Sequence, residues 1–276
     1  MKLKFSQRKG YKPIPTPLAK DSISIDLRNS LWNVLDMFIW RSDNFLGYFN
    51  RHPGIEKFSH TLWWEYFKQP IDTIPLNSDR ILQIIREYFF SCNWYEFYDY
   101  LEHILEYKFD YPVEPEVLTL MVNHVLEGEL AAYRFVDGIF TEITDKQEVE
   151  MIESALSSTD FPSVTAHLRR ALELLSDHKK PDYRNSIKES ISAVESIAQI
   201  ITGNSKATLG DALKILEKSI NLHNALKEGF TKIYGYTSDK GGIRHAMLEE
   251  PNLTIADAKY FLLTCTSFIN YLKSKM

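Results

Sequence analysis

The sequence has few cysteines, no long apolar run and no excess of positive charge, and each absence excludes a class of protein. Two cysteines in 276 residues cannot form a disulfide framework. Cys92 and Cys265 lie in apolar helical patterns, so we expect buried, reduced thiols. No run reaches the ~20 apolar residues that span a bilayer, and the first residues lack the apolar core of a signal peptide. We therefore expect a cytoplasmic protein without membrane contact.

The charge balance narrows the classes of ligand. A formal net charge of −5 excludes the global positive field of a stand-alone nucleic-acid-binding protein, so contact with RNA requires a local patch or a partner. The histidines are scattered and no Cys-x-x-Cys pair occurs, so the sequence predicts no metal site. Because no glycine-rich phosphate loop is present either, we expect no cofactor.

Most of the chain has the pattern of amphipathic helices. Hydrophobic residues make up 44% of the sequence, and they recur at three- and four-residue steps between breaks at proline, glycine and asparagine. The aromatic residues of the first half follow the same spacing, which is typical of a core. These patterns predict helices at about 25–41, 55–68, 79–91, 94–109, 115–128, 145–157, 162–178, 182–202, 207–217, 219–234 and 254–274.

Several helix ends are marked by residues that cap helices. Pro181 and Asp182 precede the longest predicted helix, and Gly203 follows it. Thr254 and Asp257 form a variant of the capping box at the start of the last helix. These signals fix the expected ends of two helices in the second half.

Two segments depart from the helical pattern. Residues 1–23 contain six lysines and arginines and three prolines, which favours an extended basic arm that is solvated, packs on a neighbour or contacts phosphate. Within residues 132–144, Asp137 and Gly138 separate two short aromatic and β-branched runs, which predicts a β-hairpin.

The predicted fold class is all-α, with two helical subdomains and one small β-hairpin between them. Residues 24–158 form the first helical domain, which ends in the hairpin and a linking helix. Residues 159–276 form a second helical bundle.

The sharpest chemical signal is the stretch around Arg244 and His245. Gly241 and Gly242 break the helical pattern directly before them, so both residues lie in the connection between the last two predicted helices. A guanidinium can hold a phosphate, and an imidazole can transfer a proton near neutral pH. Alternatively, His245 caps a backbone carbonyl and Arg244 pairs with a nearby glutamate.

A second group of polar residues lies on the predicted helix 182–202. At ~100° per residue, Arg184, Lys188 and Glu195 share one edge of its buried seam. Such an edge can face a cleft and support a site. It can also be a solvated border whose long side chains cover the core.

Four blocks of the sequence resemble the AbiJ-type abortive-infection proteins (the AbiJ N-terminal-domain family), and the second half resembles a HEPN domain. The blocks are Leu27–Asn33, Tyr133–Val136, Tyr183–Glu195 and Gly241–Ala246. The resemblance implies an all-α HEPN fold, a homodimer and a role in bacterial defence against phage. Many HEPN domains are metal-independent ribonucleases whose site combines an arginine and a histidine from both subunits.

The resemblance implies roles for the residues singled out above. His245 would transfer protons and Arg244 would stabilise the phosphate, with Arg184 and Glu195 orienting them. The usual HEPN signature separates the arginine and histidine by several residues, whereas here they are adjacent. Two functions therefore stay open: an endoribonuclease toxin, and a catalytically inactive HEPN-like subunit that senses or binds RNA, a nucleotide, a defence protein or a phage protein. A purely structural subunit is the third alternative.

Overall fold

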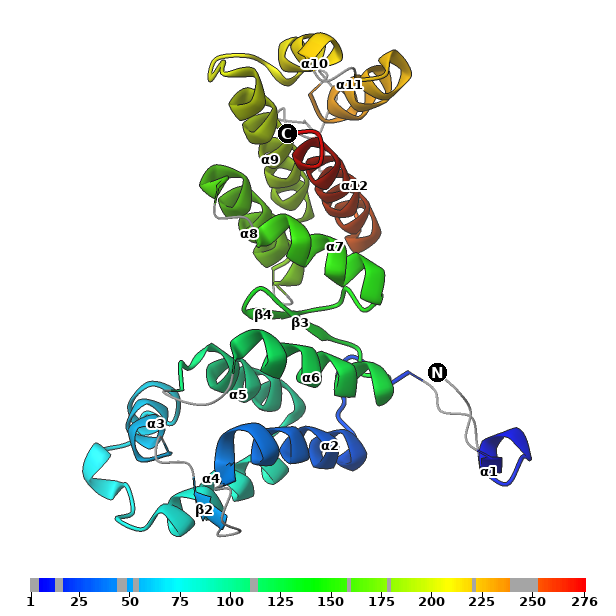
Figure 1. The fold of residues 1–276 in the computed structure, drawn as a ribbon. Coiled ribbons are helices and arrows are strands. Elements are labelled where there is room, and N and C mark those ends of the chain that lie inside the picture. Colours follow the sequence, from blue (N-terminus) through cyan, green and yellow to red (C-terminus); the bar gives the residue numbers. More distant parts are fainter. Residues whose placement is uncertain are drawn as a thin grey trace. The chain divides into compact units, whose positions relative to one another are not determined.

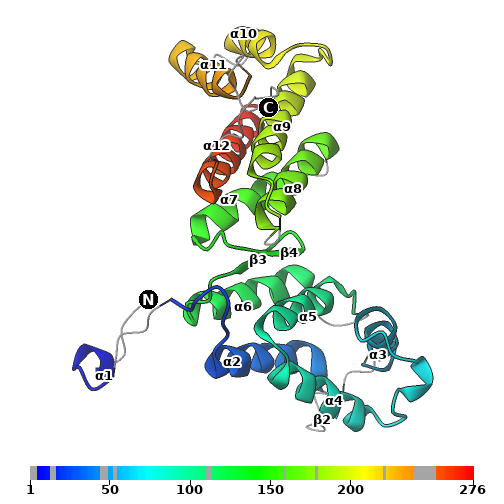
Figure 2. The same cartoon turned by 180° about the vertical axis from the view of Figure 1, so that it is seen from behind.

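The computed structural model describes residues 5–12, 17–43, 49–51, 55–109, 114–157, 160–177, 180–219, 222–238 and 253–276. The chain forms two compact units, Met1–Thr144 and Asp145–Met276. Both consist mainly of helices, and the described residues contain only two short β-ribbons (Figures 1 and 2). The predicted all-α fold class is therefore confirmed. No helix among the described residues is long and apolar enough to cross a membrane.

The described residues of the first unit form six α-helices, separated or extended by short turns. The α-helices are α1 (Phe5–Arg8), α2 (Ile25–Leu35), α3 (Ile55–Thr61), α4 (Ser78–Ser91), α5 (Trp94–Glu106) and α6 (Pro115–Gly128). Two π-helical turns, η1 (Asp36–Trp40) and η2 (Leu62–Tyr66), continue α2 and α3, and a 3₁₀ turn, η3 (Ile71–Thr73), precedes α4. Helix α1 falls in the segment for which the sequence predicted an extended arm.

Aromatic rings fill the core of the first unit. Phe89 of α4 lies 4.7 Å from Phe97 of α5 between ring centroids, in a tilted arrangement that suits the ring quadrupoles. The largest fully buried side chains are Trp40, Trp63, Tyr100, Phe58, Phe89 and Phe97. The concentration of aromatic residues in this half of the sequence thus reflects packing.

A buried arginine ties the first helix of this core to the end of α4. Arg28 of α2 donates hydrogen bonds to the carbonyl oxygens of Phe89 and Cys92, the latter at 2.6 Å. Its guanidinium also lies 4.8 Å from the ring centroid of Phe97. The charge is therefore compensated by carbonyls that would otherwise lack a partner at the C-terminal end of α4.

The predicted β-hairpin is present at the end of the first unit. Strand β3 (Arg134–Val136) pairs antiparallel with β4 (Ile139–Thr141). Asp137 and Gly138 both have positive φ, 47° and 91°, as a type I′ turn requires. The side-chain amide of Asn123 in α6 bonds to both backbone groups of Phe135, at 2.7 and 2.8 Å. A second ribbon, β1 (Arg41–Asp43) with β2 (Phe49–Arg51), was not predicted.

Part of the N-terminal segment packs on this unit. The backbone N–H of Leu18 donates to the carbonyl of Leu130 at 3.0 Å, and Lys20 forms an ion pair with Glu142 at 2.5 Å. These contacts join residues 17–20 of the arm to the same chain, whereas the packed alternative predicted from the sequence was contact with a neighbouring molecule.

The second unit is a bundle around α9. Its helices are α7 (Lys146–Leu156), α8 (Pro162–Ser176), α9 (Tyr183–Thr202), α10 (Leu209–Ser219), α11 (Asn224–Ser238) and α12 (Ile255–Lys273). Helix α9 packs against α8, α10 and α12, as Figure 1 shows. Its buried seam includes Ile187, Ile191, Val194 and Ala198.

Helix α7 packs within the second unit, although the sequence prediction placed it with the first. Asn270 and Lys273 of α12 donate to the carbonyl oxygens of Met151 and Ala155 at 2.9 and 2.7 Å. Lys259 forms an ion pair with Glu148 at 2.6 Å. The division by packing therefore falls after Thr144, before the linking helix rather than after it.

Candidate functional site

The residues with the sharpest predicted chemistry lie outside the described residues. Gly241, Gly242, Arg244 and His245 follow α11, which ends at Ser238, and precede Leu253, where the description resumes. What the structure describes is the pair of helices on either side of them.

Two aromatic contacts join helix α11 to helix α12. Phe230 stacks on Phe268 with ring centroids 3.5 Å apart, and Tyr236 stacks on Phe261 at 5.7 Å. Because the later residue of α11 meets the earlier residue of α12, the end of α11 lies beside the start of α12. The two helix ends that flank Arg244 and His245 in the sequence therefore lie together.

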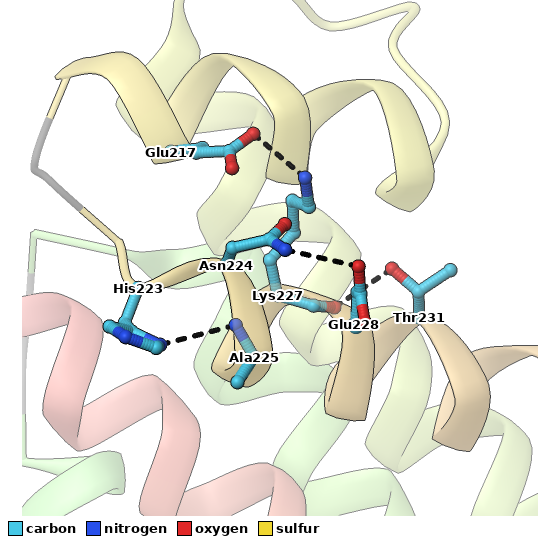
Figure 3. A network of polar contacts seen from close by, with 7 residues as sticks. All are labelled: Glu217, His223, Asn224, Ala225, Lys227, Glu228 and Thr231. Carbon is cyan, nitrogen blue, oxygen red and sulfur yellow. Dashed lines mark hydrogen bonds and ion pairs between the residues drawn. The ribbon is translucent and has the colours of Figure 1, made fainter.

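Polar contacts gather at the other end of α11, and one of them joins it to α10 (Figure 3). Lys227 of α11 forms an ion pair with Glu217 of α10 at 2.8 Å, while Asn224 donates to Glu228 at 3.1 Å. The backbone N–H of Ala225 donates to Nδ1 of His223 at 3.2 Å, which places the proton of a neutral His223 ring on Nε2. These contacts fix the start of α11.

The predicted edge residues of α9 lie on one continuous helix, as their spacing requires. Lys188 is exposed, whereas Arg184 and Glu195 are half-buried. At ~100° per residue the three fall within one narrow sector of the helix surface. Their role in supporting Arg244 and His245 stays a prediction.

The structure brings together a pair that sequence reasoning missed. His167 Nδ1 of α8 lies 2.6 Å from Glu189 Oε2 of α9, with side chains 38% and 24% exposed. One helical turn away, Ser186 donates to the carbonyl of Ala171 at 2.7 Å. Because Glu189 directly follows Lys188, it is rotated by ~100° toward α8, away from the edge of Arg184. The pair links two helices.

A hollow of about 520 Å³ lies against α10. It is lined by Lys214, Ile215, Glu217 and Lys218. Lys214 forms an ion pair with Asp211 at 3.2 Å, and Glu217 is engaged with Lys227. Two of the three charged groups that line the hollow are thus already neutralised by protein partners.

The fold defines the class of protein: an all-α chain of two helical units, the first closed by a β-hairpin. The model of the family described as AbiJ N-terminal domain 4 matches residues 3–158, and the chain belongs to this family. Membership indicates a role in abortive infection, a defence against phage. The match ends at residue 158, so the likeness of the second unit to a HEPN domain stays a prediction. No curated protein and no solved structure matches the chain.

Proposed function

We propose that this protein is an abortive-infection toxin whose second unit is HEPN-like and cleaves RNA without a metal ion. Its catalytic residues are Arg244 and His245. The observation that supports this proposal is the contact between α11 and α12, in which Tyr236 lies on Phe261. This contact lies near the two helix ends that flank the Arg244–His245 segment in the sequence, and a connection between helices is a common place for catalytic groups.

The reaction follows from the chemistry of the two side chains. His245 takes the proton of the 2′-hydroxyl, whose oxygen attacks the adjacent phosphorus while the 5′-oxygen leaves. A protonated histidine returns a proton to that leaving oxygen. The guanidinium of Arg244 stabilises the charge of the pentavalent phosphate. A homodimer with two-fold symmetry supplies the second histidine, so that base and acid come from different subunits.

The test is an RNA degradation assay with purified protein in the presence of EDTA. Wild type is expected to degrade total RNA, and Arg244→Ala and His245→Ala to lower the rate by at least about 100-fold. Arg170→Ala and His124→Ala are matched controls, because both residues are exposed and lie outside the proposed site. Cleavage by His245→Ala at the wild-type rate would exclude this assignment, and loss of cleavage with EDTA would exclude the metal-free mechanism.

The rival function is a catalytically inactive HEPN-like subunit that binds RNA, a defence protein or a phage protein. It is favoured by the adjacency of Arg244 and His245, because neighbouring side chains on a helix diverge by ~100° and address one phosphate only where a turn bends them together. If His245→Ala still arrests growth during phage infection, the rival holds. Sedimentation at micromolar concentration provides an independent test, because a monomer contradicts a site shared between two subunits.

A further inference from the structure

We propose that Tyr236 and Tyr260 form a stacking surface for the bases of single-stranded RNA. This inference rests on the proposed function and adds to it the form of the substrate and the way it is held. The surface lies where α11 ends and α12 begins, beside the helix ends that flank Arg244 and His245 in the sequence.

The two tyrosines are the most exposed aromatic residues described in the second unit. Tyr236 is 58% exposed and Tyr260 is 57% exposed, whereas Phe261, whose ring contacts both, is 5% exposed. The planes of Tyr236 and Phe261 differ by only 11°, and Tyr260 meets Phe261 edge-on at 86°, with centroids 5.5 Å apart. Phe261 thus anchors both exposed rings.

Anchored rings of this kind suit nucleobases. One face of Tyr236 is covered by Phe261, so a base on its opposite face extends an existing stack and requires little ordering of the side chain. Stacking tolerates any sequence, because every base has a π-face. A duplex hides these faces, so the surface selects single strands.

The charges near the two rings are compatible with an RNA backbone. Lys232 lies one turn before Tyr236 on α11, is exposed, and forms no ion pair with a described residue. The acidic neighbour Asp257 is engaged in the cap of α12, where it accepts from Thr254 at 2.7 and 2.8 Å. Lys232 is therefore the side chain expected to meet a phosphate.

The two exposed rings offer too small an area to bind a protein partner stably. A stable protein interface covers about 800 Å² on each side, which a pair of tyrosines does not provide. A base covers one ring at a time, so the observed arrangement fits RNA better than a second copy of this chain.

The experiment measures RNA binding without cleavage. Fluorescence anisotropy of a labelled 10-nucleotide single strand, about the size of a single-strand binding site, is followed in full-length protein that carries His245→Ala. Adding Tyr236→Ala or Tyr260→Ala is expected to weaken binding by about 5- to 100-fold, as the loss of one base–aromatic stack does. Tyr236→Trp and Tyr260→Phe keep a ring and should bind like the parent. Tyr95→Ala is the matched control, because Tyr95 is a half-exposed tyrosine of the first unit.

The outcomes separate this inference from the proposed function. Unchanged RNA affinity of both alanine variants overturns the stacking surface, even if wild type cleaves RNA. If wild type does not cleave RNA but the alanine variants lose binding, the surface stands and the nuclease assignment fails. If the alanine substitutions alter sedimentation rather than RNA affinity, the two tyrosines form a protein interface and the inference is wrong.

Discussion

The carboxylate of Glu102 in α5 accepts a hydrogen bond of 2.6 Å from the backbone N–H of Phe140 in β4. Burial raises the pKa of this carboxyl from 4.5 to about 7, and the charges of Asp99 and Glu106 act in the same direction, against the hydrogen bond from Phe140. The β-hairpin is thus attached to the helices through a group that titrates near neutral pH.

This pKa gives the unfolding free energy a definite pH dependence. Between pH 4.5 and about 7 the folded protein holds a proton on Glu102 that the unfolded chain releases. The contribution of Glu102 to the free energy of unfolding is therefore full below pH 4.5 and is lost as the pH rises to about 7. Glu102→Gln keeps an oxygen for Phe140 and removes the charge. Urea unfolding at pH 8 should show a gain of roughly 1 to 2 kcal/mol, allowing for solvent screening, and little difference at pH 4.

The matched control is Glu116→Gln on the exposed start of α6, which should change stability little at either pH. A Glu102→Gln variant that is less stable than wild type at pH 8 contradicts the assigned cause.

The bonds of Arg28 predict a large loss of stability when its guanidinium is removed. Arg28→Met fills similar space but leaves the carbonyls of Phe89 and Cys92 without their donor, so unfolding should require about 3 kcal/mol less. The control is Arg86→Met, because Arg86 is exposed and lies over the rings of Trp32 and Phe90. It should cost about 1 kcal/mol or less. Equal losses in the two variants would show that the carbonyl bonds contribute little.

Substituting alanine for Gly138 in the hairpin turn and for Gly128 at the end of α6 should change the stability of the protein in opposite directions. Gly138 has φ +91°, so Gly138→Ala should cost about 1 to 2 kcal/mol through backbone strain. The added Cβ would lie 3.6 Å from Glu106 Oε1, an ordinary contact. Gly128→Ala, at the end of α6 in open space, should instead stabilise by about 0.4 to 1 kcal/mol. Thermal unfolding of both variants tests the pair, and a Gly138→Ala variant as stable as Gly128→Ala would exclude the strain.

Both cysteines should resist thiol reagents in the folded protein. Burial raises the pKa of Cys265, and burial also raises that of Cys92 although Arg28 beside it acts the other way. At pH 8 a colorimetric thiol reagent should react at least about 100-fold more slowly with native than with urea-unfolded protein. Cys92→Ala and Cys265→Ala assign each thiol, and one thiol reacting at the rate of free cysteine would contradict the burial.

Capping residues in the sequence correctly predicted the ends of helices α9 and α12, because a cap depends on residues close in the chain. Asp182 caps α9, Gly203 ends it with φ 64°, and Thr254 with Asp257 forms the capping box of α12. The π-helical turns escaped prediction because apolar spacing does not separate them from α-helix. Strands β1 and β2 escaped it because no Asp-Gly or Asn-Gly pair lies between them, unlike the Asp137-Gly138 pair between β3 and β4.

Contacts between helices could not be predicted from the sequence patterns. The pairing of His167 with Glu189 follows from the register of α8 on α9, which no spacing along the chain reveals. The membership of α7 in the second unit likewise depends on α12, more than a hundred residues later. Of the candidate site, the sequence located Arg184, Lys188 and Glu195 on one helix edge, while the exposure of Tyr236 and Tyr260 required the structure.

The packing of α7 on α12 affects the order in which the two units can fold while the chain is being synthesised. The first helix of the second unit binds the last, so a nascent chain cannot complete this unit until residues 255–273 have left the ribosome. The first unit has all its helices by then and can fold earlier. A chain truncated before Leu253 would therefore retain a folded first unit but expose the apolar face that α7 presents to α12, and degradation should remove it.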